Sequence, residues 1–363
     1  MNGSLTHKDY KKLFDDKQIQ SIKFNIDQIQ PSSLDLTLSN ECYEIKYSFL
    51  SPKSKVVSKL KNLIIRKINL NKKFKFKKNK TYIVKLNEKL TLNKNIFGHC
   101  NPKSSTGRLD IFCRTIVDYS DEYEKIPKGY KGDIFLEITT RSFDIKFQAG
   151  DKLNQLRLVY EKHNYLNDKD LISINKQDQI VFDEKNINFK IENGLKVSVY
   201  LSSPNKVLAY CAKSNAPAID FSKINLHKIN DYWKPIYSKN KSIIIEKNKF
   251  YILRSKERVR IPPKLAGEMI PYDTGIGDFR AHYAGFFDPG FGDPNGSYAV
   301  LEVKTNELPF LLEDGQTIAR IKYEKLNKKS NIVYGLDIKS NYQNQGLKLS
   351  KHFINNEEEN FNY

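Results

Sequence analysis

The chain of 363 residues carries two copies of one sequence pattern, and this duplication constrains the fold more than any other feature. Lys78–Val84 (Lys-Asn-Lys-Thr-Tyr-Ile-Val) recurs as Lys247–Leu253 (Lys-Asn-Lys-Phe-Tyr-Ile-Leu), an offset of 169 residues. Leu136-Glu137-Ile138 recurs as Leu301-Glu302-Val303, an offset of 165. A period this long exceeds that of solenoid repeats and indicates a duplicated domain. We therefore predict two tandem copies of one domain.

Each copy reads mainly as short strands with alternating apolar residues, such as Thr81–Leu86 and Ser242–Ile245, separated by turns rich in Asn, Gly, Pro and Lys. Helical periodicity is not sustained over several turns, and short helices are expected only near His7–Asp16 and around 227–233. The pattern predicts an all-β fold. We assign the first domain to 1–165, the second to 177–335 and a C-terminal tail to 336–363, with the boundary in the polar stretch 164–176.

Composition narrows the class of protein further. No apolar stretch approaches the roughly 18 residues of a membrane span, and the N-terminus lacks the apolar core of a signal peptide, so we expect no membrane partner and a cytoplasmic location. The four cysteines form no C-x-x-C pair and are expected to be reduced and mostly buried.

The net charge of +19 raises the question of nucleic-acid binding. Lys72–Lys78 interleaves lysines with Phe74 and Phe76, as single-strand binders do, but strand alternation puts both aromatics on one face with lysines opposite. Lys, Asn and Ile are abundant throughout, as in proteins of A+T-rich genes. Nucleic-acid binding is therefore not favoured, although the positive field suits a polyanionic nucleotide.

The segment Asn101–Arg108 (Asn-Pro-Lys-Ser-Ser-Thr-Gly-Arg) concentrates groups that bind anions. Two hydroxyls, Ser104 and Ser105, lie between two cations, Lys103 and Arg108, so O–H, ammonium and guanidinium donors can converge on a phosphate. The spacing does not match a Walker loop. By itself the segment is equally consistent with an ordinary polar turn. We call Pro102–Arg108 the phosphate turn.

The two copies differ where function is expected. At the place of the phosphate turn the second copy has Tyr272–Gly277, which lacks the cations, and opposite Asp35 it has Lys196. Conversely, the second copy carries an Asp-Pro-Gly turn, Ala284–Gly290, which the first copy lacks. These differences predict one composite site, with phosphate donors from the first copy and a base pocket from the second.

These segments give the chain a resemblance to bacterial dCTP deaminases of the long, duplicated type, within the dUTPase-like superfamily. Ile29–Leu36 resembles the first superfamily motif, Pro102–Arg108 the phosphate motif, Ala284–Gly290 the nucleoside motif and Ser340–Lys351 the tail that closes over the triphosphate. The resemblance implies two tandem dUTPase-like β-barrel (distorted jelly-roll) domains with a few short helices. It also implies a hydrolase that converts dCTP to dUTP and ammonia in dTTP precursor synthesis.

The resemblance extends to partners and ions. It implies a homo-oligomer with a trimeric barrel arrangement, dTTP as a feedback inhibitor, and Mg²⁺ bound with the triphosphate rather than by the protein. The zinc deaminase signature, H-x-E with P-C-x-x-C, is absent, so no protein-bound metal is expected.

Without a metal, a carboxylate must take the proton of the attacking water and pass protons to N3 and the leaving amine. The resemblance places this glutamate in the Leu-Glu dipeptide after the nucleoside motif, where Glu302 stands. Its repeat counterpart Glu137 is the alternative; we favour Glu302 because it follows the intact Asp-Pro-Gly turn. Arg108 is a further catalytic candidate that could orient the water or the glutamate.

The remaining site residues also follow from the resemblance. Ser104, Ser105 and Arg108 are expected to bind phosphate oxygens, with Lys103 adding charge. Asp288 is expected to bind the sugar hydroxyl, and Ala284 to allow close backbone approach to the cytosine. His282 is either a polar lining residue or a core histidine. In the tail, Tyr334 and Gln345 match triphosphate positions, whereas the lysine expected between them appears as Asn341.

Two alternatives stay open. A dUTP pyrophosphatase shares the fold and the Ser-Ser turn, but its tail is rich in Gly-Phe-Gly-Ser-Thr-Gly, whereas this tail reads Tyr342-Gln-Asn-Gln-Gly346; a bifunctional enzyme is a variant of this alternative. The second alternative is a non-catalytic nucleotide or nucleic-acid binder that has lost its base.

Overall fold

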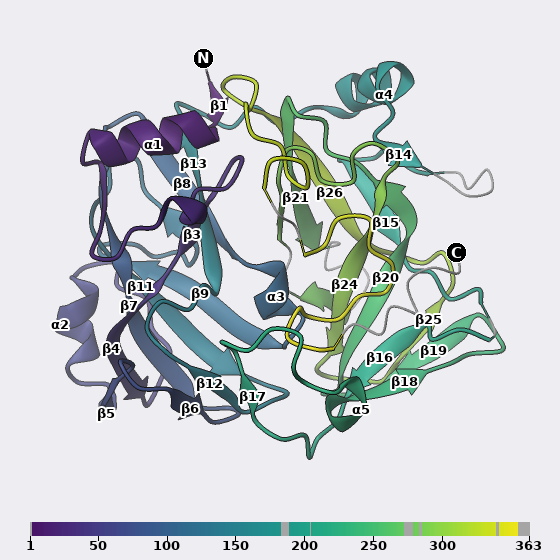
Figure 1. The fold of residues 1–363 in the computed structure, drawn as a ribbon, viewed down its shortest axis with the longest axis horizontal. Helices are drawn as coiled ribbons and strands as arrows, with labels where there is room; N and C mark the ends of the chain where they lie inside the picture. The colour runs from purple at the N-terminus through teal and green to yellow at the C-terminus, as the bar shows by residue number, and fades with distance from the viewer. Residues whose placement is uncertain are drawn as a thin grey trace. The chain divides into compact units, whose positions relative to one another are not determined.

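The computed structural model describes residues 2–182, 189–203, 205–271, 279–282, 285–338 and 341–354. These residues form two compact units (Figure 1). Unit 1 comprises Met1–Asn164 with Pro217–Lys223 and Leu326–Asn331, and unit 2 comprises the rest. The two short segments of unit 1 that come late in the chain fall inside the range 177–335 that the sequence analysis gave to the second domain. Within the described ranges, no helix is long and apolar enough to cross a membrane.

Unit 1 is built from three sheets. The first has the order β3-β13-β8-β10 with β1 also on β13, the second β5-β4-β7-β11-β9 with β2 on β7, and the third β17-β12-β6. The strands are β1 (Gly3–Ser4), β2 (Ile19–Ser21), β3 (Leu34–Leu36), β4 (Leu38–Ile45), β5 (Ile64–Asn69), β6 (Phe74–Phe76), β7 (Thr81–Thr91), β8 (Ile96–Pro102), β9 (Ile111–Val117), β10 (Lys125–Ile126), β11 (Lys131–Thr140), β12 (Ile145–Phe147), β13 (Asn154–Tyr160) and β17 (Ile219–Asp220).

Unit 2 repeats this topology except for β1 and β17, which have no counterpart among its described strands. Its sheets have the orders β15-β26-β21-β23, β18-β16-β20-β24-β22 with β14 on β20, and β19-β25. The strands are β14 (Val181–Phe182), β15 (Leu195–Ser198), β16 (Ala209–Ala212), β18 (Trp233–Ile236), β19 (Ser242–Ile245), β20 (Phe250–Val259), β21 (Leu265–Pro271), β22 (Phe279–His282), β23 (Phe286–Phe287), β24 (Ser297–Thr305), β25 (Phe310–Glu313) and β26 (Thr317–Lys325). The predicted tandem all-β fold is therefore confirmed.

Helices are short in both units. Unit 1 contains α1 (His7–Asp15), η1 (Ile26–Gln28), α2 (Val56–Leu60) and α3 (Ser104–Gly107), and unit 2 contains α4 (Asp168–Gln177) and α5 (Ile229–Tyr232). The helices expected near 7–16 and 227–233 are confirmed as α1 and α5. The stretch 164–176, taken from the sequence as a polar boundary, instead contains most of α4, which begins at an Asn167 cap and buries only Leu171. One buried residue leaves too weak an apolar period to see in the sequence.

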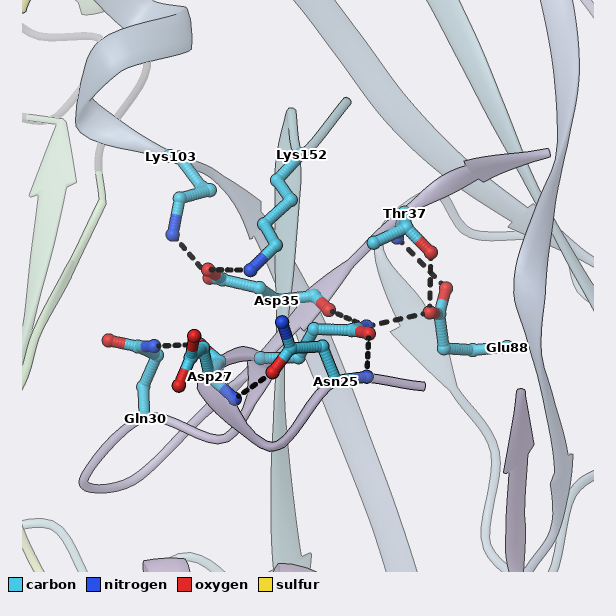
Figure 2. Close-up of polar contacts among 9 residues, drawn as sticks. Asn25, Asp27, Gln30, Asp35, Thr37, Glu88, Lys103 and Lys152 are labelled. Carbon is cyan, nitrogen blue, oxygen red and sulfur yellow. Dashed lines mark hydrogen bonds and ion pairs between the residues drawn. The ribbon is translucent and has the colours of Figure 1, made fainter. Parts of the chain in front are cut away.

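A pair of buried carboxylates shows the duplication at the level of single side chains. Glu88 accepts hydrogen bonds from the Thr37 backbone N–H (2.9 Å) and hydroxyl (2.7 Å), and Glu257 accepts the same two bonds from Ser198 (2.9 and 2.5 Å). Figure 2 shows the hydrogen bonds between Thr37 and Glu88 in unit 1. Burial raises the pKa of both glutamates and the hydrogen bonds oppose that shift. Glu88 on β7 thus holds the residue between β3 and β4, and Glu257 on β20 holds the last residue of β15. We therefore interpret both carboxylates as structural.

The burial of side chains agrees with two predictions made from the sequence. In β6, Phe76 is fully buried and Lys75 is exposed, as the alternation predicted. All four cysteines are buried free thiols, which confirms that prediction.

Candidate functional site

The phosphate turn leaves the end of β8 in unit 1. The Leu153 carbonyl fixes the turn from β13's side, since it accepts the Lys103 N–H (2.9 Å) and the Thr106 hydroxyl (2.8 Å). The Arg108 N–H then donates to the Ser104 carbonyl (3.1 Å) and closes the α3 turn. Lys103, Ser104, Ser105 and Arg108 therefore share one short, anchored turn. Ser105 and Arg108 are buried, while Lys103 and Ser104 are partly exposed.

Asp35 is the direct electrostatic partner of this turn. Its carboxylate forms an ion pair with the Lys103 ammonium and lies 3.8 Å from the Lys152 ammonium (Figure 2). Two contacts hold Asp35 in place: β3 pairs with β13, which sets Asp35 opposite Gln155, and the Asp35 carbonyl accepts the Gln28 side-chain amide (3.0 Å). From the sequence, Asp35 could be compared only with its repeat counterpart Lys196, and its contact with Lys152 was not predicted.

Glu137 in unit 1 belongs to a closed polar cluster. It lies in register with Arg114 on the neighbouring strand β9, and Arg114 donates to its Oε1 from Nη2 (2.6 Å) and Nε (3.2 Å). The Ser48 hydroxyl donates to its Oε2 (2.5 Å), and the Tyr123 ring covers the guanidinium at 3.6 Å. Both carboxylate oxygens are thus engaged by groups of the protein, and only 2% of the residue is exposed.

Glu302 occupies the matching position of unit 2 with a different neighbour. It is buried on β24, and the residue in register with it on β22 is His282 rather than an arginine. The backbone therefore brings these two predicted residues together. Ala284 lies outside the described residues, as do the Tyr272–Gly277 counterparts of the phosphate turn.

The described part of the Asp-Pro-Gly turn follows β23. The turn is fixed to the chain at Ile261, whose carbonyl accepts the Gly290 N–H (2.8 Å) and whose N–H donates to the Phe291 carbonyl (2.8 Å). Gly290 has a φ of +97°, and a Cβ there would lie 2.2 Å from Val333 Cγ1, so only glycine fits. Asp288 is buried beside this glycine.

Two segments of unit 2 contact this turn: residues 333–334, and the C-terminal segment, defined as the described residues 341–354, through Gln343. The Tyr334 N–H donates to the Pro289 carbonyl (2.8 Å), and its ring lies 6.1 Å from that of Phe291. Gln345 is buried and donates from Nε2 to the Tyr298 carbonyl (2.9 Å) at the start of β24. Unit 2 therefore holds four of the predicted site residues on adjoining elements: Asp288, Glu302, Tyr334 and Gln345. Unit 1 holds the predicted residues of the phosphate turn: Lys103, Ser104, Ser105 and Arg108.

Gln343 was missed by sequence reasoning, because a single amide in a polar tail gives no signal. Its Oε1 accepts the Gly292 N–H (3.1 Å), and its Nε2 donates to the carbonyls of Gly290 (3.1 Å) and Asp293 (3.2 Å). The side chain thereby fixes three points of the loop that follows Asp288.

Two further findings concern ionisable groups. The Glu124 carboxylate accepts hydrogen bonds from the Thr115 hydroxyl (2.6 Å) and from the Asn154 side-chain amide (3.3 Å). The residue as a whole is partly exposed, but its carboxylate is buried, and desolvation raises the pKa of Glu124 to about 7. Across the described residues, no group of three or more His, Cys, Asp and Glu side chains is arranged to hold a metal ion.

Comparison with known proteins covers nearly the whole chain. Residues 1–162 match the family model of the 2'-deoxycytidine 5'-triphosphate deaminase N-terminal domain, and residues 167–353 match that of the C-terminal domain. Among solved structures, the chain is similar to the 2'-deoxycytidine 5'-triphosphate deaminase from Agrobacterium tumefaciens. The TM-score is 0.85 at 37% sequence identity, covering 90% of this chain and 99% of that one.

Proposed function

The chain belongs to the 2'-deoxycytidine 5'-triphosphate deaminase family, and on that premise we propose that it hydrolyses dCTP to dUTP and ammonia with Glu302 as the proton-transferring carboxylate. One observation carries the proposal: the phosphate turn and Asp35 of unit 1 are replaced in unit 2, whereas the Asp-Pro-Gly turn that precedes Glu302 in unit 2 is absent from unit 1. A duplicated fold keeps such differences where the two copies have separate tasks.

The reaction needs a water activated against C4 of cytosine. We propose that Glu302 takes one proton from this water and passes it to N3 as the oxygen bonds to C4. It then takes the second proton from the hydroxyl now on C4 and passes it to the amine, so that the C4–N4 bond breaks and ammonia leaves. Its burial at the centre of β24 suits this role, because a carboxylate shielded from solvent exchanges protons with the substrate rather than with bulk water. Arg108 is proposed to bind the substrate and to orient the water.

Glu137 is the alternative carboxylate, and its contacts fit a structural role. Its oxygens already accept hydrogen bonds from Arg114 and Ser48, and proton transfer would require these contacts to break. A carboxylate held by a guanidinium is stabilised in its charged form. We therefore interpret Glu137 as a structural residue of unit 1 that fills the position Glu302 has in unit 2.

The substrate-binding assignments stay proposals. Ser104, Ser105, Arg108 and Lys103 offer donors suited to phosphate oxygens, which supports the predicted triphosphate site. Asp288, Tyr334 and Gln345 are proposed on the nucleoside and tail side; the hydrogen bond from Gln345 to Tyr298 ties that segment to the strand of Glu302. Mg²⁺ is proposed as part of the substrate, carried by the triphosphate, since the donors of the turn suit phosphate and not a cation. A trimeric assembly and inhibition by dTTP also stay predictions.

Product analysis tests the function. Incubation of the protein with dCTP and Mg²⁺, followed by chromatographic separation, is expected to give dUTP and ammonia in equal amounts. Release of pyrophosphate together with dUMP would establish the bifunctional alternative. If dCTP binds without any product, incubation with dUTP separates the other two alternatives: release of pyrophosphate would establish the dUTP pyrophosphatase, and intact dUTP the non-catalytic binder.

A further inference from the structure

The environment of Asp35 contains one more cation than a simple ion pair needs. The Lys103 and Lys152 ammonium groups both face the Asp35 carboxylate, one at each oxygen (Figure 2). The side chain of Asp35 is only 6% exposed, against 22% for Lys103 and 32% for Lys152. A single buried carboxylate thus shares two lysines beside the phosphate turn.

Lys152 is held by its neighbours in the chain. The Asp151 carbonyl accepts the Leu38 N–H (3.0 Å), and Leu153 is the residue whose carbonyl anchors the phosphate turn. Its backbone is therefore fixed on both sides, which keeps the side chain within reach of Asp35.

The second copy supports a functional reason for the second lysine. At the position of Lys152 it has Thr317, and at the position of Asp35 it has Lys196, which pairs with Glu192 instead. The position of Lys103 is also changed in that copy, to Tyr272. Three charged positions that meet in unit 1 are thus all different in the copy without a phosphate turn.

We propose that Lys152 is a positioning residue for the triphosphate: it stays paired with Asp35 and thereby allows Lys103 to leave Asp35 and bind a phosphate group. This inference rests on the proposed function. If Lys103 left a buried carboxylate with no other cation, desolvation of that charge would oppose substrate binding. Lys152 keeps Asp35 neutralised throughout the exchange and so lowers the free energy of the bound state.

The first experiment measures KM and kcat for dCTP at low ionic strength. Lys152→Met is expected to raise KM about tenfold with kcat nearly unchanged, because Lys103 could then bind phosphate only by leaving the buried Asp35 carboxylate without a cation. Lys152→Arg is expected to restore KM. The inhibition constant of deoxycytidine, which has no phosphate, is expected to stay the same. Lys85→Met is the matched control, since Lys85 is also 32% exposed and pairs with Asp133 (2.8 Å); its KM is expected to stay at the wild-type value.

The second experiment asks whether Lys152 acts through Asp35. The Asp35→Asn variant has no carboxylate here that needs a counter-ion. In this background Lys152→Met is therefore expected to change KM less than about twofold. A full tenfold rise in that background would mean direct contact with phosphate and would overturn the proposal, as would an unchanged KM for Lys152→Met alone.

The proposed function and the role of Lys152 can be rejected independently of each other. Absence of dCTP turnover in the wild-type protein would reject the proposed function; the same variants would then be compared by calorimetric titration with dCTP. Equal dissociation constants for the wild type and Lys152→Met would reject the role of Lys152.

Discussion

Glu137 and Glu302 occupy the same place in two copies of one fold, and the residues in register with them on the neighbouring strands differ. Arg114 on the adjacent strand engages Glu137, whereas His282 stands in register with Glu302. At the scale of single residues, the proposed division of roles therefore coincides with an arginine on the neighbouring strand of one copy and a histidine on that of the other.

We expect Glu302→Gln to lower kcat by about 10²-fold or more, because the amide cannot accept the proton of the water. Calorimetric titration should show that dCTP still binds. Glu137→Gln is the matched variant: it should weaken the contact with Arg114 and lower the free energy of unfolding by about 1–3 kcal/mol with little change in kcat. The reverse pattern, with turnover lost only in Glu137→Gln, would transfer the catalytic role to Glu137.

Arg108→Ala should weaken binding of dCTP more than binding of dCMP. The guanidinium offers charge-assisted hydrogen bonds worth about 1.5–3 kcal/mol, and the triphosphate presents more oxygens to it than a single phosphate does. The measurement is the ratio of the two dissociation constants. An unchanged ratio would contradict the assignment of Arg108 to the terminal phosphates.

At the scale of elements, the Gln343 side-chain amide joins the C-terminal segment to the Asp-Pro-Gly turn and to the loop that follows it. Gln343→Met keeps the size of the side chain and removes all of its hydrogen bonds to Gly290, Gly292 and Asp293. We expect KM for dCTP to rise while kcat changes less, since the turn would be less well ordered before substrate binds. Gln179→Met, which removes one amide contact to Val181 in the same unit, is the control. A lower melting temperature with an unchanged KM would limit Gln343 to a role in stability.

The loop that precedes β10 contains an ionisable group that makes stability depend on pH. Burial raises the pKa of Glu124 to about 7, well above its value in an unfolded chain. The folded state therefore binds this proton more tightly than the unfolded state. The resulting stabilisation is fully present below the unfolded-state pKa and is lost as the pH rises to about 7.

Thermal unfolding of Glu124→Gln should reveal this contribution. The amide cannot ionise, so the fall in melting temperature between pH 5 and pH 8 is expected to be smaller in the variant than in the wild type. Glu122→Gln is the control, since Glu122 is exposed and lies two residues away. Parallel pH profiles for Glu124→Gln and the wild type would contradict the assignment.

The elements themselves differ in how far the sequence predicts them. The duplicated strands follow from apolar alternation and from the repeat, because both are local patterns. α4 does not, since its only buried residue is Leu171. Contacts such as Arg114 with Glu137 depend on which strands become neighbours and in which register, and this is set by the tertiary fold. Lys152 is an intermediate case: Thr317 stands opposite it in the repeat, but only the structure shows that it reaches Asp35.

At the scale of the whole molecule, duplication alone would give two equal nucleotide sites per chain. The chain instead carries one set of phosphate donors, in unit 1, and one Asp-Pro-Gly turn, in unit 2. Glu137, the counterpart of Glu302, is engaged by Arg114 and Ser48. On the proposed assignment of site residues, each chain therefore holds one complete set, whatever the number of chains in the assembly.

Calorimetric titration with dCTP is thus expected to give a stoichiometry close to one nucleotide per chain. Glu302→Gln suits the experiment, because slow turnover keeps the ligand intact while it binds. Arg108→Ala should lower the affinity without changing the stoichiometry, since it weakens each site rather than removing a second class of sites. A value close to two would mean that unit 1 also binds nucleotide next to Glu137. Arg114 would then have to exchange the carboxylate for the ligand, and the interpretation of Glu137 as a structural residue would be wrong.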